Sequence, residues 1–305
     1  MYVRLLGTAA GGGYPQWNCH CSNCQSVRAG NRVTEERSQT CVAFSADAAR
    51  WYLIGASPDV RIQLESFAPL RASDAVRGCA IEAVLLASAD LDHVLGLFLL
   101  REGCRLHVHA TTDVRRSVCD GLRLDAVLGR YCGLEWHEPP AYRGQLHRRD
   151  GQPSGLLYQA FPVPGRPPRY REGVADAGAG DCVGYRIEDP RTGGRLAVVP
   201  AAAALPPSVM GRLRDCDAVL LDGTFWSEDE LIVAGAGETP ARLMGHLPIG
   251  GTDGSLEQIA RLPVSRKILI HINNTNPILV SGSPECNEVG RHGVEIGRDG
   301  LELEL

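Results

Sequence analysis

Short apolar runs alternate with helical patterns through both halves of the chain, and this alternation is the feature that most restricts the fold. The apolar runs predict strands, and the segments between several of them have the periodicity of helices. Two comparable halves of this kind predict an α/β sandwich, in which two sheets pack face to face with helices outside. We expect strands at residues 3–6, 41–45, 51–54, 81–87, 106–110, 156–163, 183–188, 195–199, 218–222 and 267–272, and helices at 94–101, 112–122, 207–214 and 255–262.

The length of 305 residues is compatible with a single domain, because α/β chains of this size often fold as one unit. We therefore expect one domain over residues 1–305. The irregular loops 162–168 and 176–181 are long for a compact domain, and such loops often border a site.

The charge of the chain argues against two classes of partner. A net charge of −5 does not favour binding to nucleic acid or to an anionic membrane surface. No apolar run approaches the ~20 residues that span a bilayer, and residues 1–7 lead too soon into glycines for a signal peptide. We expect a cytoplasmic protein whose eleven cysteines are reduced.

Three of these cysteines, Cys19, Cys21 and Cys24, lie within a single short segment. Thiolates at this spacing suit a tetrahedral zinc site that a fourth protein ligand closes. His20 is an adjacent candidate for that ligand. Because a closed site leaves no position for substrate, the predicted role is structural.

A second candidate site follows the strand at 81–87, where Asp90, Asp92 and His93 precede a helical run. Polar side chains at the carboxyl end of a strand are typical of α/β binding sites. The alternative is that Asp92 caps the helix and His93 is an ordinary surface histidine. His107 and His109, on the next strand, could be a metal pair, but their position beyond this turn favours a polar sheet face.

The segment from Ser88 to His93 resembles a degenerate HxHxDH motif of metallo-β-lactamase-fold proteins. Ser88 and Asp90 stand at its two histidine positions, whereas Asp92 and His93 match. Asp222, at the end of a strand, and His271, near the C-terminus, follow in the order of that superfamily. The resemblance implies an αββα sandwich with an N-terminal zinc-binding insertion.

Departures from the superfamily pattern limit the number of metals. Residues 198–202 lie where a bridging aspartate is usual, and residues 163–165 lie where another histidine is expected. The interpretation is one metal held by Asp92, His93 and His271, with Asp90 able to join. Two histidines and one carboxylate with open positions suit iron, while manganese and zinc also accept such ligands.

Longer segments resemble one family, coenzyme PQQ synthesis protein B, from end to end of the chain. They are residues 11–21, 92–97, 221–226, 244–249 and 271–279. The resemblance implies a role in the biosynthesis of pyrroloquinoline quinone (PQQ), a redox cofactor made from a glutamate and a tyrosine within a small peptide.

The resemblance also implies ligands and assembly for the cysteine site. A related phosphodiesterase of the superfamily closes this zinc site with a histidine three residues after its last active-site histidine. The corresponding residue here is Asn274, with water or His20 as substitutes. Because the zinc motif is linked to dimerisation in the family, a homodimer is expected.

Three functions agree with these patterns. The first is iron-dependent hydroxylation of the tyrosine ring of a Glu–Tyr-derived precursor, in which His246 or Asp222 orients substrate or relays protons. For His246 the alternative is a hydrogen bond to backbone. The second function is a soluble carrier of PQQ or its precursor toward the periplasm. The third is a metal-dependent hydrolase, which the missing ligands disfavour.

Overall fold

Two seven-stranded sheets face each other in the computed structural model, which describes residues 1–71, 76–173 and 178–305. Residues 176–177 of the expected loop at 176–181 lie outside this description. In spatial order, the first sheet contains β14 (Glu302–Glu304), β1 (Tyr2–Gly7), β2 (Cys41–Ser45), β3 (Trp51–Ile54), β4 (Ile81–Leu85), β5 (Leu106–His109) and β6 (Leu134–His137). The second contains β13 (Glu295–Ile296), β12 (Arg266–Ile270), β11 (Ala218–Asp222), β10 (Arg195–Val199), β9 (Val183–Glu188), β8 (Pro153–Pro162) and β7 (Gly144–His147).

Both sheets change from antiparallel to parallel pairing along their width. Strands β3 to β6 are parallel to one another, and so are β10 to β13. The carboxyl ends of parallel strands are the usual position of functional side chains in α/β proteins. The two parallel regions therefore provide the edge where the candidate site forms.

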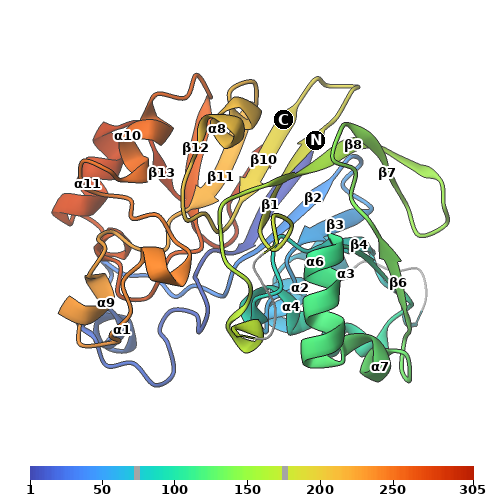
Figure 1. The fold of residues 1–305 in the computed structure, drawn as a ribbon, viewed down its shortest axis with the longest axis horizontal. Coiled ribbons are helices and arrows are strands. Elements are labelled where there is room, and N and C mark those ends of the chain that lie inside the picture. Colours follow the sequence, from blue (N-terminus) through green and yellow to red (C-terminus); the bar gives the residue numbers. More distant parts are fainter. Residues whose placement is uncertain (72–75, 174–177) are drawn as a thin grey trace.

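The helices are short and lie on the outer faces of the sheets, as the alternation predicts. Figure 1 shows α8, α10 and α11 on one side of the paired sheets and α2, α3, α6 and α7 on the other. The α-helices are α1 (Ser22–Arg28), α2 (Val60–Glu65), α3 (Ala68–Arg71), α4 (Leu91–Val94), α5 (Gly96–Leu99), α6 (Thr112–Arg116), α7 (Leu124–Leu128), α8 (Pro207–Leu213), α9 (Glu230–Val233), α10 (Ser255–Ala260) and α11 (Pro284–Arg291). Within the described ranges, no helix is long and apolar enough to cross a membrane.

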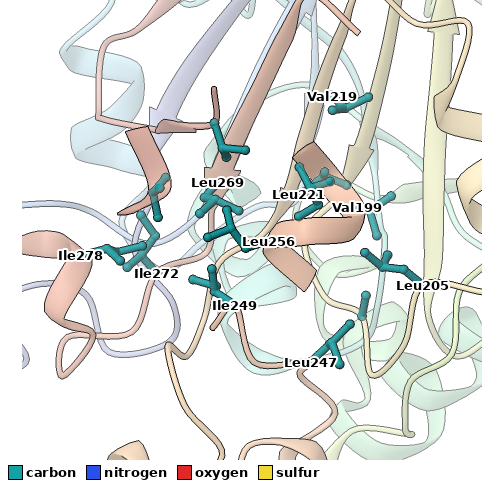
Figure 2. Packing of buried hydrophobic residues seen from close by; sticks show 14 of the residues in the cluster. Val199, Leu205, Val219, Leu221, Leu247, Ile249, Leu256, Leu269, Ile272 and Ile278 are labelled. Carbon is teal, nitrogen blue, oxygen red and sulfur yellow. The ribbon is translucent and has the colours of Figure 1, made fainter. Parts of the chain in front are cut away.

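Three apolar clusters hold these layers together. The central one joins inward-facing residues of both sheets, such as Leu85 of β4, Leu220 of β11 and Ile268 of β12. A second packs the outer face of the second sheet against helices, and Figure 2 shows Leu221 of β11 and Leu269 of β12 near Leu256 of α10. A third cluster packs the outer face of the first sheet against α2, α3 and α5 to α7.

The expected helix at 94–101 is divided into α4 and α5, because the chain presses closely against the turn after β3. The amide of Gly96 donates to the carbonyl of Ala56 at 2.8 Å. A Cβ atom on Gly96 would lie 2.3 Å from the carbonyl oxygen of Ser57, so only glycine fits. This contact fixes the turn that carries Asp92 and His93 relative to β3.

Candidate metal centres

Asp92, His93 and His271 converge between the two sheets, although 179 positions separate Asp92 from His271 in the sequence. Asp92 and His93 lie in α4, which follows β4 of the first sheet, and His271 directly follows β12 of the second. Nε2 of His271 lies 2.9 Å from Oδ2 of Asp92, and Nε2 of His93 lies 3.9 Å from the same oxygen. Ligand atoms bound to one ion at about 2.0–2.2 Å are separated by roughly 3–4 Å, so these three atoms have the spacing of a ligand set.

Hydrogen bonds decide which nitrogen of His271 carries a proton. The hydroxyl of Thr224 lies 2.6 Å from Oδ1 of Asp222, and an ionised carboxylate can only accept. Thr224 therefore donates to Asp222 and accepts from Nδ1 of His271 at 2.8 Å. The remaining lone pair, on Nε2 of His271, faces the carboxylate of Asp92, and a cation or a second proton is required between them.

The same arrangement orients His93. Ser88 donates its hydroxyl to Oδ2 of Asp90 at 3.1 Å and accepts from Nδ1 of His93 at 3.2 Å. Nε2 of His93 is buried and has no hydrogen-bond partner among the described residues. A buried lone pair without a donor is costly, and a metal ion shared with Asp92 would satisfy it. The residues present therefore fit a bound divalent cation.

The electrostatics of the cluster favour a cation at this point. Burial alone would raise the pKa of Asp92, but His93 and His271 hold it well below its usual range. Burial lowers the pKa of His93, which keeps this imidazole neutral and able to ligate. For His271, burial is outweighed by the hydrogen bond to Asp92, and its pKa is raised.

The backbone at His271 has an unusual conformation that serves this geometry. His271 has φ +57°, in the left-handed region that residues other than glycine rarely adopt. Its neighbours are held on both sides, because Ile272 donates its amide to the carbonyl of Thr8 at 2.9 Å and Gly223 donates to that of Ile270 at 2.8 Å. The change of direction at the end of β12 lets the imidazole meet Asp92.

Asp222 and His246 lie on the other side of His271. The rings of His246 and His271 stack with centroids 5.3 Å apart, and Nδ1 of His246 donates to Oδ2 of Asp222 at 2.8 Å. Asp222 also accepts from the amides of Ala202 at 2.8 Å and Thr224 at 2.9 Å. With the hydroxyl of Thr224, four donors use both oxygens of Asp222. Asp222 thus positions other groups. Its bond to His246 uses Nδ1 of that ring and not Nε2.

Although burial opposes ionisation, His246 lowers the pKa of Asp222. An ionised Asp222 holds the proton of His246 on Nδ1 and leaves Nε2 as a free acceptor. The sequence interpretation of His246 as a simple backbone-bonding residue therefore does not describe its side chain, which bonds to a carboxylate.

The carboxylate of Asp90 does not lie among the Asp92, His93 and His271 ligand atoms. Asp90 is the N-terminal capping residue of α4 and has an extended backbone, with ψ 148°. Its Oδ2 accepts a hydrogen bond from the hydroxyl of Ser88. That bond occupies one of its two carboxylate oxygens. Asp90 supports His93 through Ser88 in this arrangement.

The three clustered cysteines surround one side chain, that of Asn274. Its Nδ2 lies 3.1 Å from Sγ of Cys19, 3.6 Å from Sγ of Cys21 and 3.3 Å from Sγ of Cys24. A half-turn of the amide would direct its carbonyl oxygen to the same point. His20 is exposed and does not belong to this group.

The cysteine cluster fits a tetrahedral zinc ion of the closed, structural kind. Its three sulfur atoms all lie within 4.8 Å of one another. Burial raises the pKa of the Cys24 thiol to about 11, which leaves this thiol protonated unless a cation offsets the cost. Zinc bound to thiolates would supply that charge.

One loop connects the two centres. It begins at His271 and continues through Asn274, and Asn276 anchors it by donating from Nδ2 to the carbonyls of Gly223 and Thr224 at 3.0 and 3.1 Å. Asn274 is also held by α1, because Nδ2 of Asn23 donates to the backbone carbonyl of Asn274 at 3.1 Å. The α1 segment therefore supports the loop that presents His271.

A cleft of about 880 Å³ borders the cysteine cluster and extends to Gly11, which lies next to Asp92. Gly11 is on its wall, and a Cβ atom there would lie 3.4 Å from Oδ2 of Asp92. Cys19, Cys21 and Asn274 form another part of the wall, opposite residues of the α9 region. Arg169 also borders the cleft and is exposed.

Tyr170 connects Arg169 to the metal-binding turn. The phenol of Tyr170 donates to the carbonyl of Ala89 at 2.7 Å, in the turn that precedes Asp92. Sequence reasoning missed this pair, as well as the roles of Ser88 and Thr224. The Asp-Gly-Thr segment at 222–224 was a visible signal, because a hydroxyl two residues after a strand-end aspartate can bond back to it.

Comparisons with known proteins agree with the geometry. The model of the beta-lactamase superfamily domain matches residues 50–272. The coenzyme PQQ synthesis protein B of Azoarcus sp. (strain BH72) is 43% identical, and that of Pseudomonas syringae pv. syringae (strain B728a) is 41% identical, each over 100% of both chains. The crystal structure of Zn²⁺-bound PqqB from Methylobacterium extorquens superposes with a TM-score of 0.91 at 36% identity and covers 100% of both chains.

A diphosphatase of the PhnP family, at a TM-score of 0.68 and 20% identity, shares the fold alone. The metallo-β-lactamase fold and the family resemblance expected from the sequence are both confirmed. The full-length identity with these relatives shows that the chain belongs to the coenzyme PQQ synthesis protein B family, within the β-lactamase superfamily.

Proposed function

We propose that this protein acts in pyrroloquinoline quinone biosynthesis by hydroxylating the tyrosine ring of a Glu–Tyr-derived precursor, with ferrous iron held by Asp92, His93 and His271. One observation carries the proposal: a single carboxylate and two imidazoles direct their lone pairs to one point. Two histidines and one carboxylate are the ligand set of non-heme iron oxygenases. Iron bound there would supply the activation of dioxygen. One oxygen atom would enter the ring, and the other would leave as water with two protons and two electrons from a soluble reductant.

The surrounding residues have separate tasks in this proposal. His246 holds its Nδ1 proton on Asp222 at 2.8 Å, so its Nε2 can accept the proton that the substrate releases. Arg169, on the wall of the cleft, can pair with a carboxylate of the precursor. Zinc at Cys19, Cys21 and Cys24, with the amide oxygen of Asn274, would stabilise the loop that carries His271.

A two-metal hydrolase is a weaker reading of the same residues. A second ion needs its own ligands, but four donors already occupy the oxygens of Asp222. Ser88 stands at a superfamily histidine position and serves as a support for His93. Among the described residues, Asp222, His246 and His271 are also close enough to share an ion, but His271 already belongs to the first set and Asp222 is occupied by its donors.

The test combines the metal with the substrate. The protein is prepared without oxygen, loaded with ferrous iron and mixed with a Glu–Tyr peptide and excess ascorbate as the two-electron reductant. Products are followed by mass spectrometry after oxygen is admitted. We expect an iron-dependent gain of oxygen that is lost in an Asp92→Ala, His93→Ala variant. An Asp253→Ala, His292→Ala variant changes the same residue types outside both centres and should retain the activity.

Other outcomes would replace the proposal. If iron is bound but no oxygen is gained, hydroxylation is wrong, and binding of PQQ itself would then support a soluble carrier. A cleaved peptide would support the hydrolase. The expected homodimer is measured separately, by light scattering of the zinc-loaded protein.

A further inference from the structure

A third group of metal-ligating side chains lies on the first sheet, away from the residues of both centres. His107 belongs to β5, and Glu135 and His137 belong to β6, the last strand of the sheet. In the parallel pairing of these strands, His107 is opposite Glu135 and His109 is opposite His137. Side chains alternate along a strand, so all four lie on the same face.

The opposite face of β5 and β6 is apolar. Leu106, Val108, Leu134 and Trp136 pack there with the helices of the outer layer. The histidine face is consequently the one directed toward the second sheet, at its edge. The sequence interpretation of His107 and His109 as part of a polar sheet face agrees with this position, and their partners come from β6.

We propose that His107, Glu135 and His137 bind a divalent transition-metal ion, of the zinc or copper class. Nδ1 of His107 lies 3.1 Å from Nε2 of His137, close to the separation of about 3.3 Å between two ligands of a tetrahedral ion. Oε1 of Glu135 lies 3.7 Å from Nε2 of His137. One ligand atom from each residue lies within 4.8 Å of the others.

His109 acts as a support for this site. Its ring stacks on His137 with centroids 4.8 Å apart, and its Nδ1 lies 2.8 Å from the phenol oxygen of Tyr158. That bond holds His109 against the second sheet and limits the rotation of His137. The exposed fraction of the side chain is 13% for His107 and 45% for Glu135, so the site opens to solvent on the carboxylate side.

Arg105 is a nearby cation that could compete with a metal ion for the carboxylate of Glu135. Arg105 approaches Oε2 of Glu135 at 3.7 Å, but its side chain is 65% exposed, and such surface pairs are weak. An ion here would connect the edge strand β6 to β5 and stabilise the folded chain, because the unfolded chain lacks the site.

The test counts metal ions on the full, tag-free protein. Wild-type protein and a His107→Gln, His137→Gln variant are dialysed against the same micromolar Zn²⁺, and bound zinc is measured by mass spectrometry. We expect one zinc fewer per chain in the variant. A His292→Gln variant, which changes a histidine outside the group, should match wild type.

Two further measurements distinguish loss of the metal site from a folding defect in the double variant. Glu135→Gln changes an exposed side chain and should weaken the third zinc by about tenfold, since it removes the anionic ligand. Cu²⁺ added to the zinc-loaded wild type should give an electron paramagnetic resonance signal split by two nitrogens, absent in the double variant. Equal zinc content in wild type, the double variant and Glu135→Gln would overturn the proposal.

Discussion

Nε2 of His271 lies 2.9 Å from Oδ2 of Asp92, although 179 positions separate the two residues in the sequence. This contact joins the carboxyl end of β12 in the second sheet to the turn after β4 in the first. Because Thr224 accepts the Nδ1 proton of His271, the contact needs either a second proton or a metal ion. The contact therefore joins the two sheets at the point where we propose that a metal ion binds.

Replacing Asp92 by asparagine should remove the metal and preserve the fold. The amide has the same shape but no charge, so we expect the affinity for iron to fall by more than the roughly 10- to 100-fold that loss of a supporting partner causes. Metal content after dialysis measures this, with the zinc of the cysteine cluster as an internal reference. Asp253→Asn, at an exposed aspartate outside both centres, is the matched control and should retain iron. Unchanged iron in Asp92→Asn would rule out the ligand assignment.

His246→Gln should separate catalysis from metal binding. Nε2 of His246 is the free acceptor beside His271, whereas its Nδ1 is bonded to Asp222 at 2.8 Å. We expect hydroxylation to slow by about 10²- to 10⁴-fold, the usual contribution of a general base, while iron content stays at the wild-type value. Loss of iron in this variant would instead make His246 a ligand.

Asn274→His should strengthen the zinc site. Histidine nitrogen is a better zinc ligand than an amide oxygen, and the side chain at this position faces all three sulfur atoms. We expect slower loss of zinc to a chelator and a higher melting temperature in zinc. Asn274→Leu is the opposing variant, and it should lose zinc faster than wild type. The same chelator rate in all three proteins would exclude Asn274 from the site.

Arg169→Met should impair binding of an acidic precursor. Since a hydrogen-bonded charge pair contributes about 1.5–3 kcal/mol, we expect KM for Glu–Tyr to rise about tenfold or more with little change in kcat. A Gln–Tyr peptide lacks the side-chain carboxylate and should lose less. Arg214→Met, at another exposed arginine, is the control. An equal effect on both peptides would assign Arg169 a different role.

The sequence predicted the main architecture because its strands are locally distinct. The apolar runs at 81–87 and 218–222 correspond to β4 and β11. The edge strands β6 and β14 were missed, since their pairing depends on distant partners. In β14 only Leu303 is buried, and it pairs with Val3 at the other end of the chain.

The difference between local patterns and contacts of distant residues also applies to the sites. Asp92 and His93 are adjacent and follow a strand, so a local motif identifies them. The positioning hydroxyls of Ser88 and Thr224 depend on where each imidazole ring lies, which no local pattern records. His107 was recognised, but its partners Glu135 and His137 come from a strand that only the parallel register places beside it.

Glu230 provides a test of pH dependence beside the zinc loop. The amide of Trp226 and the hydroxyl of Thr275 each donate to its carboxylate at 2.5 Å. Burial nevertheless raises the pKa of Glu230 from 4.5 to about 7. The folded protein thus binds this proton more tightly than the unfolded chain does.

The part of the unfolding free energy that depends on Glu230 should therefore be highest below about pH 4.5 and decrease as the pH rises to about 7, the value for folded Glu230. The contribution of this one group is about 3 kcal/mol. Urea unfolding of wild type and Glu230→Gln across this range measures it. The glutamine cannot ionise, so the difference in unfolding free energy between the two proteins should change with pH. Glu238→Gln, at an exposed glutamate, should leave the wild-type slope intact, and parallel curves for wild type and Glu230→Gln would show that Glu230 ionises freely in the folded chain.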